Sequence, residues 1–480
     1  MAKDDAAMSE RASLPPPSPA ALAAIRGAVG PKGVFEGADR APFLSEWRDR
    51  WPGEAALIIA PASTAEIAKV VSICADHNVA ITPQGGNTGL VGGQIPFGTE
   101  ILLSLRRMRM IRDVSPLDNT MTVDAGVTLA AAQDPPRDVD RLFPLSIGSE
   151  GSCQIGGVIS TNAGGVNVLR YGNARDLVLG IEAVLPSGEI WNGLKRLRKD
   201  NTGYDLKQLF IGGEGTLGIV TGAVLKLFPR PKKFVTAFAG VPGAEEAVAL
   251  LSHAQGATGG LVSSFELLSR RCIELLLKHI PNTRDPLASR HPWYVLMEFS
   301  SASDGLRDEV EKLLASAMDK SLLADAAIAG SEREAKEFWR MRHSMSEAIN
   351  GEGLGARHDV SVPTADIPAF LAKADAVIAA TAPGARVVAF GHIGDGNIHY
   401  DIVPPEGAGK HALDEKRKTI EARIYDLIQS FNGSISAEHG VGRHKKEAVA
   451  ARKSPVELAM MRAVKKALDP KGIMNPGKML

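Results

Sequence analysis

Two short glycine-bounded segments, GHIGDGNIH and SAEHG, hold the residue types best suited to metal chemistry. His392 and His399 flank a Gly-Asp-Gly-Asn turn, and the apolar residues on either side predict two strands, so a hairpin would bring both imidazoles together. Glu438 adds a carboxylate beside a third imidazole, His439. Two His and one Glu leave an open position on a divalent cation, as catalytic metal sites do. The alternative is a set of ordinary turn and core histidines, and the clustering favours the metal site.

Two glycine-rich stretches in the first half of the chain favour a large phosphate-bearing ligand. Residues 83–93 (PQGGNTGLVGG) follow a strand-like run, and a backbone without Cβ atoms can direct several N–H groups at one point. No Gly-Lys-Ser or Gly-Lys-Thr closes this stretch, so it is not a P-loop. A second cluster runs from residue 148 to residue 165. Either cluster alone is also explained by turns in a β-rich domain, whereas the pair indicates a ligand.

A third glycine motif, residues 213–218, matches GxGxxG in form. The residues that follow, 219–225, are β-branched and predict a strand, whereas a nicotinamide-dinucleotide fingerprint must open a helix. We therefore do not interpret it as a Rossmann motif. The chain also has no GxSxG nucleophile elbow of a serine hydrolase.

Composition excludes several classes of partner. The chain has 480 residues, with 55 basic and 55 acidic side chains and no long run of either sign, so we expect no nucleic acid or anionic membrane partner. Cys74, Cys153 and Cys272 are far apart, which predicts reduced thiols and a cytoplasmic protein. The charged residues 3–5 and the absence of an 18-residue apolar stretch predict neither a secretory signal nor a transmembrane segment.

The length of the chain predicts two or more domains, and its patterns divide it into four parts. Residues 1–54 form an N-terminal extension with a lead-in helix, and residues 55–231 are rich in glycine and short strands. Residues 232–433 alternate amphipathic helices, such as 245–253 and 306–318, with strands such as 293–299 and 386–390, which predicts helices over a sheet. Residues 434–480 hold a helix at 455–468. Ser63 begins a capping box ahead of a further helix.

The order of these motifs carries a resemblance that covers nearly the whole chain. PQGGNTG (83–89), GSEGS (148–152), NTGYDL (201–206), GGEGTLG (212–218), the two histidine motifs and NPGK (475–478) follow one another. This order resembles the FAD-linked 2-hydroxy-acid dehydrogenases of the vanillyl-alcohol-oxidase superfamily, in the branch of D-2-hydroxyglutarate dehydrogenase, D-lactate dehydrogenase and the glycolate oxidase FAD subunit. It implies an α+β fold, with a two-subdomain FAD-binding domain of the PCMH type (55–231) and an α+β cap domain (232–433) over the flavin. The segment 434–480 would return to the FAD domain.

The resemblance also implies a set of cofactor contacts. The first glycine loop would hold the FAD pyrophosphate, and it contains neither His nor Cys, so we expect a noncovalent flavin. The residues expected to line the FAD are Pro83, Gly85, Gly86, Asn87, Thr88, Gly89, Leu90, Gly148, Ser149, Gly156, Thr161, Asn162, Ile219 and Asn475.

For the substrate side, the resemblance makes His392, His399 and Glu438 metal ligands, His439 the general base and Asn397 a substrate contact. Zn²⁺ suits the donors, and Mn²⁺ or Fe²⁺ could replace it. An imidazole with a pKa near 6.5 can act as a base near neutral pH, and His439 would also touch the substrate.

Carboxylate recognition is expected from Arg342, Ser346 and Arg357, where the family usually has Arg, Thr and Lys. On one helix, Arg342 and Ser346 would share a face. We expect the neighbouring Arg340 to be solvated.

The implied function is oxidation of a D-2-hydroxy acid to the 2-oxo acid, with hydride transfer to the flavin. D-2-hydroxyglutarate is favoured over D-lactate and glycolate, because two arginines suit a dicarboxylate. A second interpretation is a flavin subunit that works only within a larger electron-transfer complex, and a third is a metallohydrolase without flavin. No Fe–S cysteine set or haem CxxCH motif is visible, so electrons would leave to an external acceptor such as an electron-transfer flavoprotein or a quinone. A homodimer is expected from the family.

Overall fold

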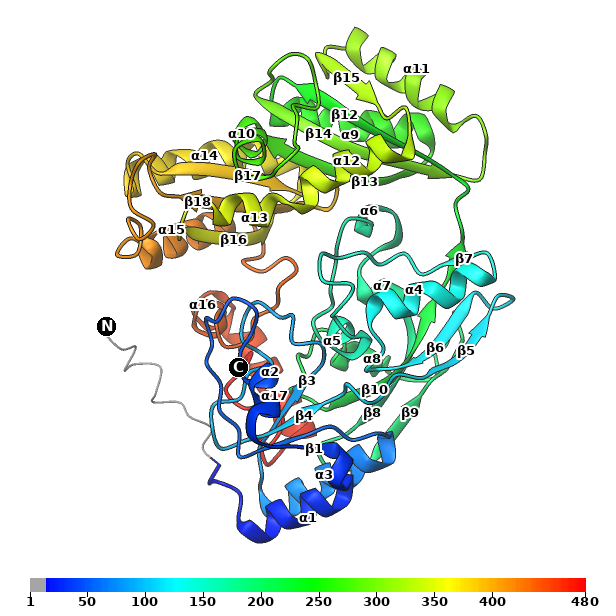
Figure 1. The fold of residues 1–480 in the computed structure, drawn as a ribbon, viewed down its shortest axis with the longest axis vertical. Coiled ribbons are helices and arrows are strands. Elements are labelled where there is room, and N and C mark those ends of the chain that lie inside the picture. The colour runs from blue at the N-terminus through cyan, green and yellow to red at the C-terminus, as the bar shows by residue number, and fades with distance from the viewer. Residues whose placement is uncertain (1–13) are drawn as a thin grey trace. The chain divides into compact units, whose positions relative to one another are not determined.

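The computed structural model describes residues 14–480, so the charged residues 3–5 lie outside the described part. The chain forms two compact units (Figure 1). The first unit comprises the described residues up to Gly164, together with Asn173–Pro229 and His439–Leu480. The second unit comprises Gly165–Gly172 and Arg230–Glu438. Within the described residues, no helix is both long and apolar enough to cross a membrane.

The first unit contains two larger sheets, each with its own helices. One sheet has the strand order β1-β2-β4-β3 with parallel β2, β4 and β3, and the other is antiparallel with the order β5-β6-β10-β8-β9. The strands are β1 Val34–Phe35, β2 Leu57–Ile59, β3 Ile81–Gln84, β4 Ile101–Ser104, β5 Ile111–Ser115, β6 Thr120–Asp124, β7 Arg141–Leu142, β8 Val178–Val184, β9 Ile190–Gly193, β10 Ile219–Lys226 and β11 Phe228–Pro229. The helices are α1 Pro19–Val29, α2 Ala41–Leu44, α3 Thr64–His77, α4 Leu129–Asp138, α5 Ile155–Ser160, α7 Ala174–Leu177, α8 Lys207–Phe210, α16 Lys446–Arg452 and α17 Pro455–Leu468.

Helix α3 connects β2 to β3 of the first sheet, and the local sequence determines where the helix begins and ends. The Ser63 hydroxyl accepts a hydrogen bond from Glu66 N at 3.2 Å, and the apolar stripe of the helix is buried. The predicted capping box is incomplete, because the Glu66 carboxylate accepts from Ala62 N instead of from Ser63 N. The helix ends at His77, and Asn78 adopts the left-handed conformation that turns the chain into β3. The first glycine loop therefore begins at the carboxyl end of a buried parallel strand.

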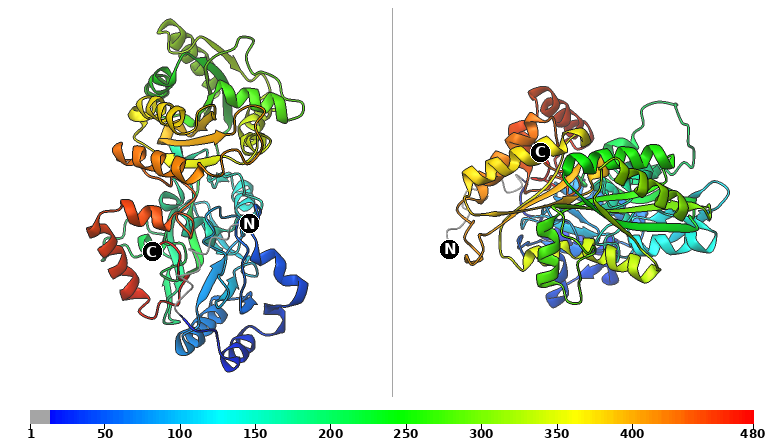
Figure 2. Two further views of the ribbon diagram at one scale, coloured as in Figure 1. Left: turned by 90° about the vertical axis from the view of Figure 1, so that its left-hand side faces the viewer. Right: turned by 90° about the horizontal axis from the view of Figure 1, so that it is seen from above.

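The second unit is built on one seven-stranded antiparallel sheet with the order β15-β12-β14-β13-β17-β18-β16. Helices cover both faces of this sheet (Figure 2, right). The strands are β12 Lys233–Val241, β13 Val262–Ser269, β14 Trp293–Ser301, β15 Asp325–Ile328, β16 Ala356–Ser361, β17 Arg386–Gly391 and β18 Asn397–Val403. The helices are α6 Val168–Tyr171, α9 Ala244–Thr258, α10 Arg270–His279, α11 Leu306–Asp319, α12 Glu332–His343, α13 Met345–Asn350, α14 Ile367–Thr381 and α15 Arg417–Ser430.

The face of this sheet that contacts α10, α12 and α13 changes character from one side to the other. Near β12 and β14 it is apolar, and Phe238, Leu268 and Leu296 form a core with side chains of these helices. Toward β17, β18 and β16 the same face becomes polar. Residues directly opposite in an antiparallel sheet point to one face, and Phe390 pairs with His399, which pairs in turn with Asp359. The predicted site residues Arg357, Asn397 and His399 lie on strands of that polar half.

Helix α6 belongs to the second unit although both chain segments that flank it belong to the first. It packs against β13 and against the turn Ile393–Asp395. Arg170 Nη1 donates to Ser300 Oγ at 2.6 Å, and a Cβ on Gly394 would lie 2.9 Å from a methyl group of Leu169. The histidine hairpin is thus packed against a segment more than 200 positions earlier in the sequence.

Candidate functional site

The histidine motif forms the predicted hairpin. Strands β17 and β18 pair antiparallel, and the short 3-10 turn Ile393–Asp395 joins them. Gly396 has φ +86°, and a Cβ there would overlap the Val362 carbonyl oxygen, so the turn requires glycine at this position. The ring centroids of His392 and His399 are 5.9 Å apart. The prediction that the turn brings the two imidazoles together is confirmed.

Glu438 lies between the two rings. His392 Nε2 is 3.7 Å from Glu438 Oε1, and His399 Nε2 is 3.8 Å from Glu438 Oε2. One ligand atom from each of the three residues lies within 4.8 Å of the other two. Two imidazole nitrogens and a carboxylate are donors that suit Zn²⁺, Mn²⁺ or Fe²⁺. The three residues predicted as ligands therefore converge and fit a divalent cation.

Asp359 holds Glu438 in place from the neighbouring strand β16. Glu438 N donates to Asp359 Oδ2 at 3.0 Å, and Ala437 N donates to the Asp359 carbonyl at 3.3 Å. Burial, together with the nearby carboxylates of Asp359 and Asp395, raises the pKa of Glu438 to about 7 against the lowering effect of His392 and Arg342. A carboxylate in this environment gains stabilisation from a bound cation.

Glu266 and Arg342 complete the buried part of the cluster. The Glu266 carboxylate lies 2.5 Å from His392 Nδ1 and accepts from Arg342 Nε at 2.6 Å. Arg342 Nη2 lies 3.4 Å from His392 Nε2, and the guanidinium carbon is 5.1 Å from the centre of the Phe390 ring. Although burial opposes ionisation, Arg342 and His392 lower the pKa of Glu266 to about 2. Burial likewise lowers the pKa of His392, but Glu266 and Glu438 raise it to about 9.

Glu266 was not singled out in the sequence. It lies on β13, within an apolar strand far from both histidine motifs, and no local spacing connects it to them. The one available signal is a glutamate in the middle of a buried strand, because a buried carboxylate needs a charged or hydrogen-bonding partner.

Asn397 carries an acceptor without a partner. Its Nδ2 donates to Asp359 Oδ1 at 3.0 Å and to the Val360 carbonyl at 2.9 Å, which fixes the orientation of the amide. Its Oδ1 is buried and has no hydrogen-bond partner in the structure. A buried orphan acceptor is costly, and a hydroxyl donor from a ligand would satisfy it.

The two further residues predicted to bind carboxylate are placed differently. Arg357 lies on β16, where Nη2 donates to Asn350 Oδ1 at 2.7 Å and Nε is 3.9 Å from Asp401 Oδ2. Ser346 is exposed on α13. The prediction that Arg342 and Ser346 share one helix is wrong, because α12 ends at His343 and α13 begins at Met345. Ser344 is both the C-cap residue of α12 and the N-cap residue of α13, in keeping with the preference of serine for helix boundaries.

Arg340 and His439 complete the predicted residues of this region. Arg340 forms an ion pair with Glu337 (2.8 Å) on the same helix and donates to the Asn282 carbonyl at 3.0 Å. His439 directly follows Glu438 and is the first residue of the last segment of the first unit.

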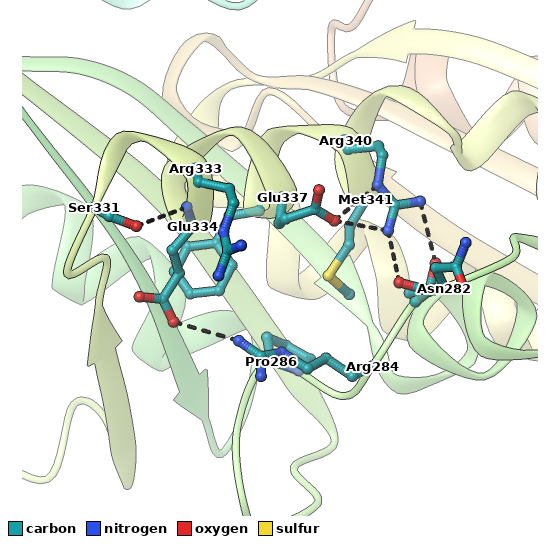
Figure 3. Close-up of a pocket in the computed structure, with 11 residues that line it drawn as sticks. Asn282, Arg284, Pro286, Ser331, Arg333, Glu334, Glu337, Arg340 and Met341 are labelled. Atoms are coloured by element: carbon teal, nitrogen blue, oxygen red, sulfur yellow. Dashed lines mark hydrogen bonds and ion pairs between the residues drawn. The ribbon is translucent and has the colours of Figure 1, made fainter.

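A cavity of about 630 Å³ beside α12 is lined by Arg340 and by none of the residues predicted to bind metal, substrate or cofactor (Figure 3). Two of its three arginines are paired with glutamates: Arg340 with Glu337, and Arg284 Nη2 at 3.6 Å from Glu334 Oε1. Among the described residues that line the cavity, none has a buried side-chain atom without a hydrogen-bond partner, so we assign the cavity no part in the chemistry.

In the first unit, the two glycine clusters lie against each other. A Cβ on Gly86 would overlap the Ser152 carbonyl oxygen, and one on Gly85 would lie 3.5 Å from Gln154 Cβ and from Gly157 N. A Cβ on Gly148 would meet no atom within 4 Å. The fold therefore brings together two clusters that are far apart in the sequence, and their main-chain atoms form one shared surface.

The remaining predicted cofactor residues lie in several segments of the first unit. Pro83 contacts the third glycine motif, since a Cβ on Gly215 would lie 2.5 Å from its ring. Thr161 Oγ1 donates to the Gly157 carbonyl at 3.0 Å, and Asn162 Oδ1 accepts from Arg175 N at 2.9 Å. The other members lie in the loop after β3 (Asn87, Thr88, Gly89, Leu90), in the 148–156 segment (Ser149, Gly156) or at the start of β10 (Ile219).

Asn475 brings the C-terminal segment to the same place. Its Nδ2 donates to the carbonyls of Gly93 (3.0 Å) and Glu214 (2.8 Å), and its N donates to the Ile81 carbonyl at 2.8 Å. The side-chain oxygens of Asn475 and Gln154 are buried without a hydrogen-bond partner in the structure. Orphan acceptors beside a glycine-lined surface fit a large polar cofactor.

Glu214 is a second residue that the sequence did not identify. It lies within the GxGxxG-like motif with φ +48°, and its two carboxylate oxygens accept from Val441 N and Gly442 N, both at 2.7 Å. The motif precedes β10 and no helix, as predicted. Its glutamate connects the C-terminal segment to the glycine motif.

Comparison with known families and proteins agrees with both units. Residues 55–193 match a family described as FAD binding domain, and residues 230–479 match FAD linked oxidases, C-terminal domain. A D-2-hydroxyglutarate–pyruvate transhydrogenase of Saccharomyces cerevisiae is 38% identical, covering 91% of this chain and 89% of the relative. The mitochondrial D-2-hydroxyglutarate dehydrogenase of Bos taurus is 36% identical (96% and 83% coverage), and a D-2-hydroxyglutarate dehydrogenase of Xanthomonas citri is 35% identical (92% and 93%).

Solved structures share the fold. p-Cresol methylhydroxylase has a TM-score of 0.75 at 18% identity, covering 96% of each chain, and alkyldihydroxyacetonephosphate synthase has 0.73 at 17% identity, covering 96% of this chain and 85% of that one. The predicted class, an α+β protein with a PCMH-type FAD-binding domain and an α+β cap, is confirmed. The chain belongs to the FAD-linked 2-hydroxy-acid dehydrogenase family and is an FAD-dependent oxidoreductase that acts on CH–OH donors.

Proposed function

We propose that the protein oxidises D-2-hydroxyglutarate to 2-oxoglutarate, with FAD bound noncovalently and a divalent cation held by His392, His399 and Glu438. The observation that carries the proposal is the convergence of two imidazole nitrogens and a carboxylate beside the buried Arg342. The printed names of the relatives from Saccharomyces cerevisiae, Bos taurus and Xanthomonas citri support the substrate.

The reaction removes two hydrogens from the substrate. The C2–H bond breaks with its electron pair and the O–H bond loses a proton, which leaves the C2=O group of the product. FAD, when bound, supplies the hydride acceptor. The cation would polarise the hydroxyl oxygen and make its proton easier to remove. His439 accepts that proton, and the orphan Asn397 Oδ1 accepts a hydrogen bond from the substrate.

Two arginines would recognise the two carboxylates. Arg342 is fixed by Glu266 through Nε, and its Nη groups, one of which lies 3.4 Å from His392 Nε2, would bind a carboxylate. Arg357 is half-buried; Asn350 holds its Nη2 at 2.7 Å, whereas Asp401 lies 3.9 Å from Nε, so an incoming carboxylate can displace Asp401. Ser346 adds a hydroxyl on α13.

A substrate panel tests the proposal. Anaerobic addition of D-2-hydroxyglutarate should bleach the flavin absorbance faster than D-lactate, glycolate or the L-enantiomers. Chelation should abolish dye reduction, and Zn²⁺ or Mn²⁺ should restore it. Full activity after complete metal removal would refute the metal role. Bound FAD that no hydroxy acid reduces would favour the flavin subunit of a larger complex. Denaturing electrophoresis should leave no fluorescent protein band, because the flavin is noncovalent.

For reoxidation we propose an external acceptor, either an electron-transfer flavoprotein or a quinone. The name of the yeast relative adds a 2-oxo acid such as pyruvate as a third candidate. Turnover of D-2-hydroxyglutarate with each acceptor in place of dye identifies which one is used. We also propose a homodimer, which sedimentation of the FAD-loaded protein checks.

A further inference from the structure

The two oxygens of the Glu266 carboxylate serve two different groups of the site. Oε1 lies 2.5 Å from His392 Nδ1, and Oε2 accepts from Arg342 Nε at 2.6 Å. The proposed function assigns one of these groups to the metal and the other to the substrate carboxylate. The Glu266 side chain thus contacts both a proposed metal ligand and the arginine proposed to bind the substrate carboxylate.

Glu266 cannot interact with solvent or with a molecule bound at the protein surface. Its side chain is fully buried on β13, one strand away from β17, which leads into His392. On the same face of the sheet, Leu268 of β13 pairs with Phe390, and Phe390 in turn lies beneath the Arg342 guanidinium. A buried carboxylate needs charged or hydrogen-bonding partners, and for Glu266 these partners are the site residues His392 and Arg342.

The contact to Nδ1 determines how His392 faces the site. A carboxylate at Nδ1 keeps the proton on that nitrogen, so the lone pair of the neutral ring is on Nε2, which faces Glu438. The contact to Nε orients Arg342 in the same way, because a guanidinium held at Nε and stacked on an aromatic ring has little freedom to rotate.

We propose that Glu266 is a positioning residue that sets the tautomer and direction of His392 and the orientation of Arg342, and thereby couples the metal site to the carboxylate site. This inference rests on the proposed roles of His392 and Arg342. It predicts that a change at Glu266 alters metal affinity and substrate affinity together, without any loss of flavin.

Glutamine is the informative replacement. A carboxylate has two acceptor oxygens, whereas the glutamine amide has one acceptor and one donor group. In Glu266→Gln, either the His392 N–H or the Arg342 N–H must therefore face an NH₂ group. The change keeps the volume of the side chain and removes one acceptor.

Glu298 provides a matched control. It is a half-buried glutamate on this face of the sheet, on the neighbouring strand β14, and it also receives a hydrogen bond from α12. Trp339 Nε1 (2.8 Å) and Thr236 Oγ1 (3.2 Å) both donate to the same oxygen, Oε2. A glutamine carbonyl can accept both bonds, and neither partner belongs to the proposed site.

The test compares FAD-loaded wild type, Glu266→Gln and Glu298→Gln. Flavin content, Zn²⁺ affinity by competition with a chromophoric chelator, and kcat and KM at saturating Zn²⁺ are measured for each. For Glu266→Gln we expect normal flavin, a Zn²⁺ affinity reduced roughly 10- to 100-fold, and a KM raised several-fold. Glu298→Gln should stay within about twofold of wild type in all of these quantities.

Each outcome decides one point. Unchanged Zn²⁺ affinity and KM in Glu266→Gln would overturn the inference and leave the proposed function intact. Equal losses in Glu298→Gln would also overturn it, because they would reflect general damage to the sheet. A wild type that binds no Zn²⁺ would refute the proposed metal site and the inference with it. If Glu266→Gln yields no flavin-loaded protein, Glu266→Asp keeps both oxygens and the charge, and the same two affinities should fall.

Discussion

The two units prepare their ligand sites in opposite ways. In the first unit, polar side chains such as Asn475 and Glu214 bind main-chain groups, and glycines leave the surface free of side chains. In the second unit, charged side chains bind one another, as Glu266 does with Arg342 and His392. The first arrangement shapes a surface for a large cofactor, and the second adjusts the charge and direction of a few atoms. Each unit should therefore be sensitive to a different kind of substitution.

The largest contrast is expected from His439→Ala. Loss of a general base lowers the rate by roughly 10²- to 10⁴-fold, and neither the glycine surface nor the three proposed ligands are altered. Flavin and metal content should stay at wild-type levels, while anaerobic flavin reduction by D-2-hydroxyglutarate slows by that factor. Stopped-flow absorbance measures this rate. Near-normal reduction would remove His439 as the base, and a parallel loss of metal would make it a ligand.

Lys478 is a buried charged side chain in the first unit. It is an exception there, because it lies beside another charged side chain and not against main-chain groups. Its Nζ is 3.6 Å from Glu100 Oε1, and burial lowers its pKa to about 8. Between pH 8 and about 10.5 the unfolded chain binds this proton while the folded chain does not, so stability rises with pH. Below pH 8, the folded protein carries the cost of a buried ammonium, up to about 3 kcal/mol.

Lys478→Met tests this cost through the pH dependence of unfolding. Relative to wild type, the variant should be most stable at pH 7, and its advantage should shrink by up to about 3 kcal/mol as pH rises to 10. Denaturant unfolding of the FAD-loaded proteins at both pH values measures the difference. A constant difference between the two proteins across this range would contradict the assignment of the titration to Lys478.

Gly86→Ala tests the glycine surface itself. The added methyl group overlaps the Ser152 carbonyl, so the two glycine clusters must separate, at a cost of about 1–3 kcal/mol. If this cost falls on cofactor binding, flavin affinity drops roughly 5- to 150-fold. The ratio of flavin to protein absorbance after dialysis reports the loss. Gly27→Ala, on helix α1 where a Cβ meets no atom within 4 Å, should retain full flavin.

Arg357→Ala should give the smallest effect and sharpen the comparison within the second unit. Arg357 contacts Asn350 and Asp401, and neither belongs to the cluster of Glu266, Arg342 and His392, so its removal should leave that cluster in place. We expect KM for D-2-hydroxyglutarate to rise about tenfold, which corresponds to about 1.4 kcal/mol, with little change for D-lactate. Steady-state dye reduction with both acids measures the ratio. An equal rise for both substrates would place Arg357 away from the second carboxylate.

Several features followed from local sequence because local physics controls them. The Gly-Asp-Gly-Asn turn predicted the hairpin of His392 and His399, and the β-branched run after Gly218 predicted β10. Amphipathic spacing predicted α3, α11 and α17. The break at Ser344 was missed, because a single serine weakens a helix only slightly and packing decides whether the helix continues.

The sequence by itself determined the family, through the order of its motifs along the chain. It also determined the two glycine clusters and the histidine hairpin, since these depend on turn residues and spacings within a few positions. Only the tertiary structure placed Glu266 beside His392 and Arg342, and Glu214 beside Val441 and Gly442. These contacts join segments separated by 76 to 228 positions. They depend on the order in which strands pair, such as β13 with β17, and that order is set by burial of the whole sheet and not by any local preference.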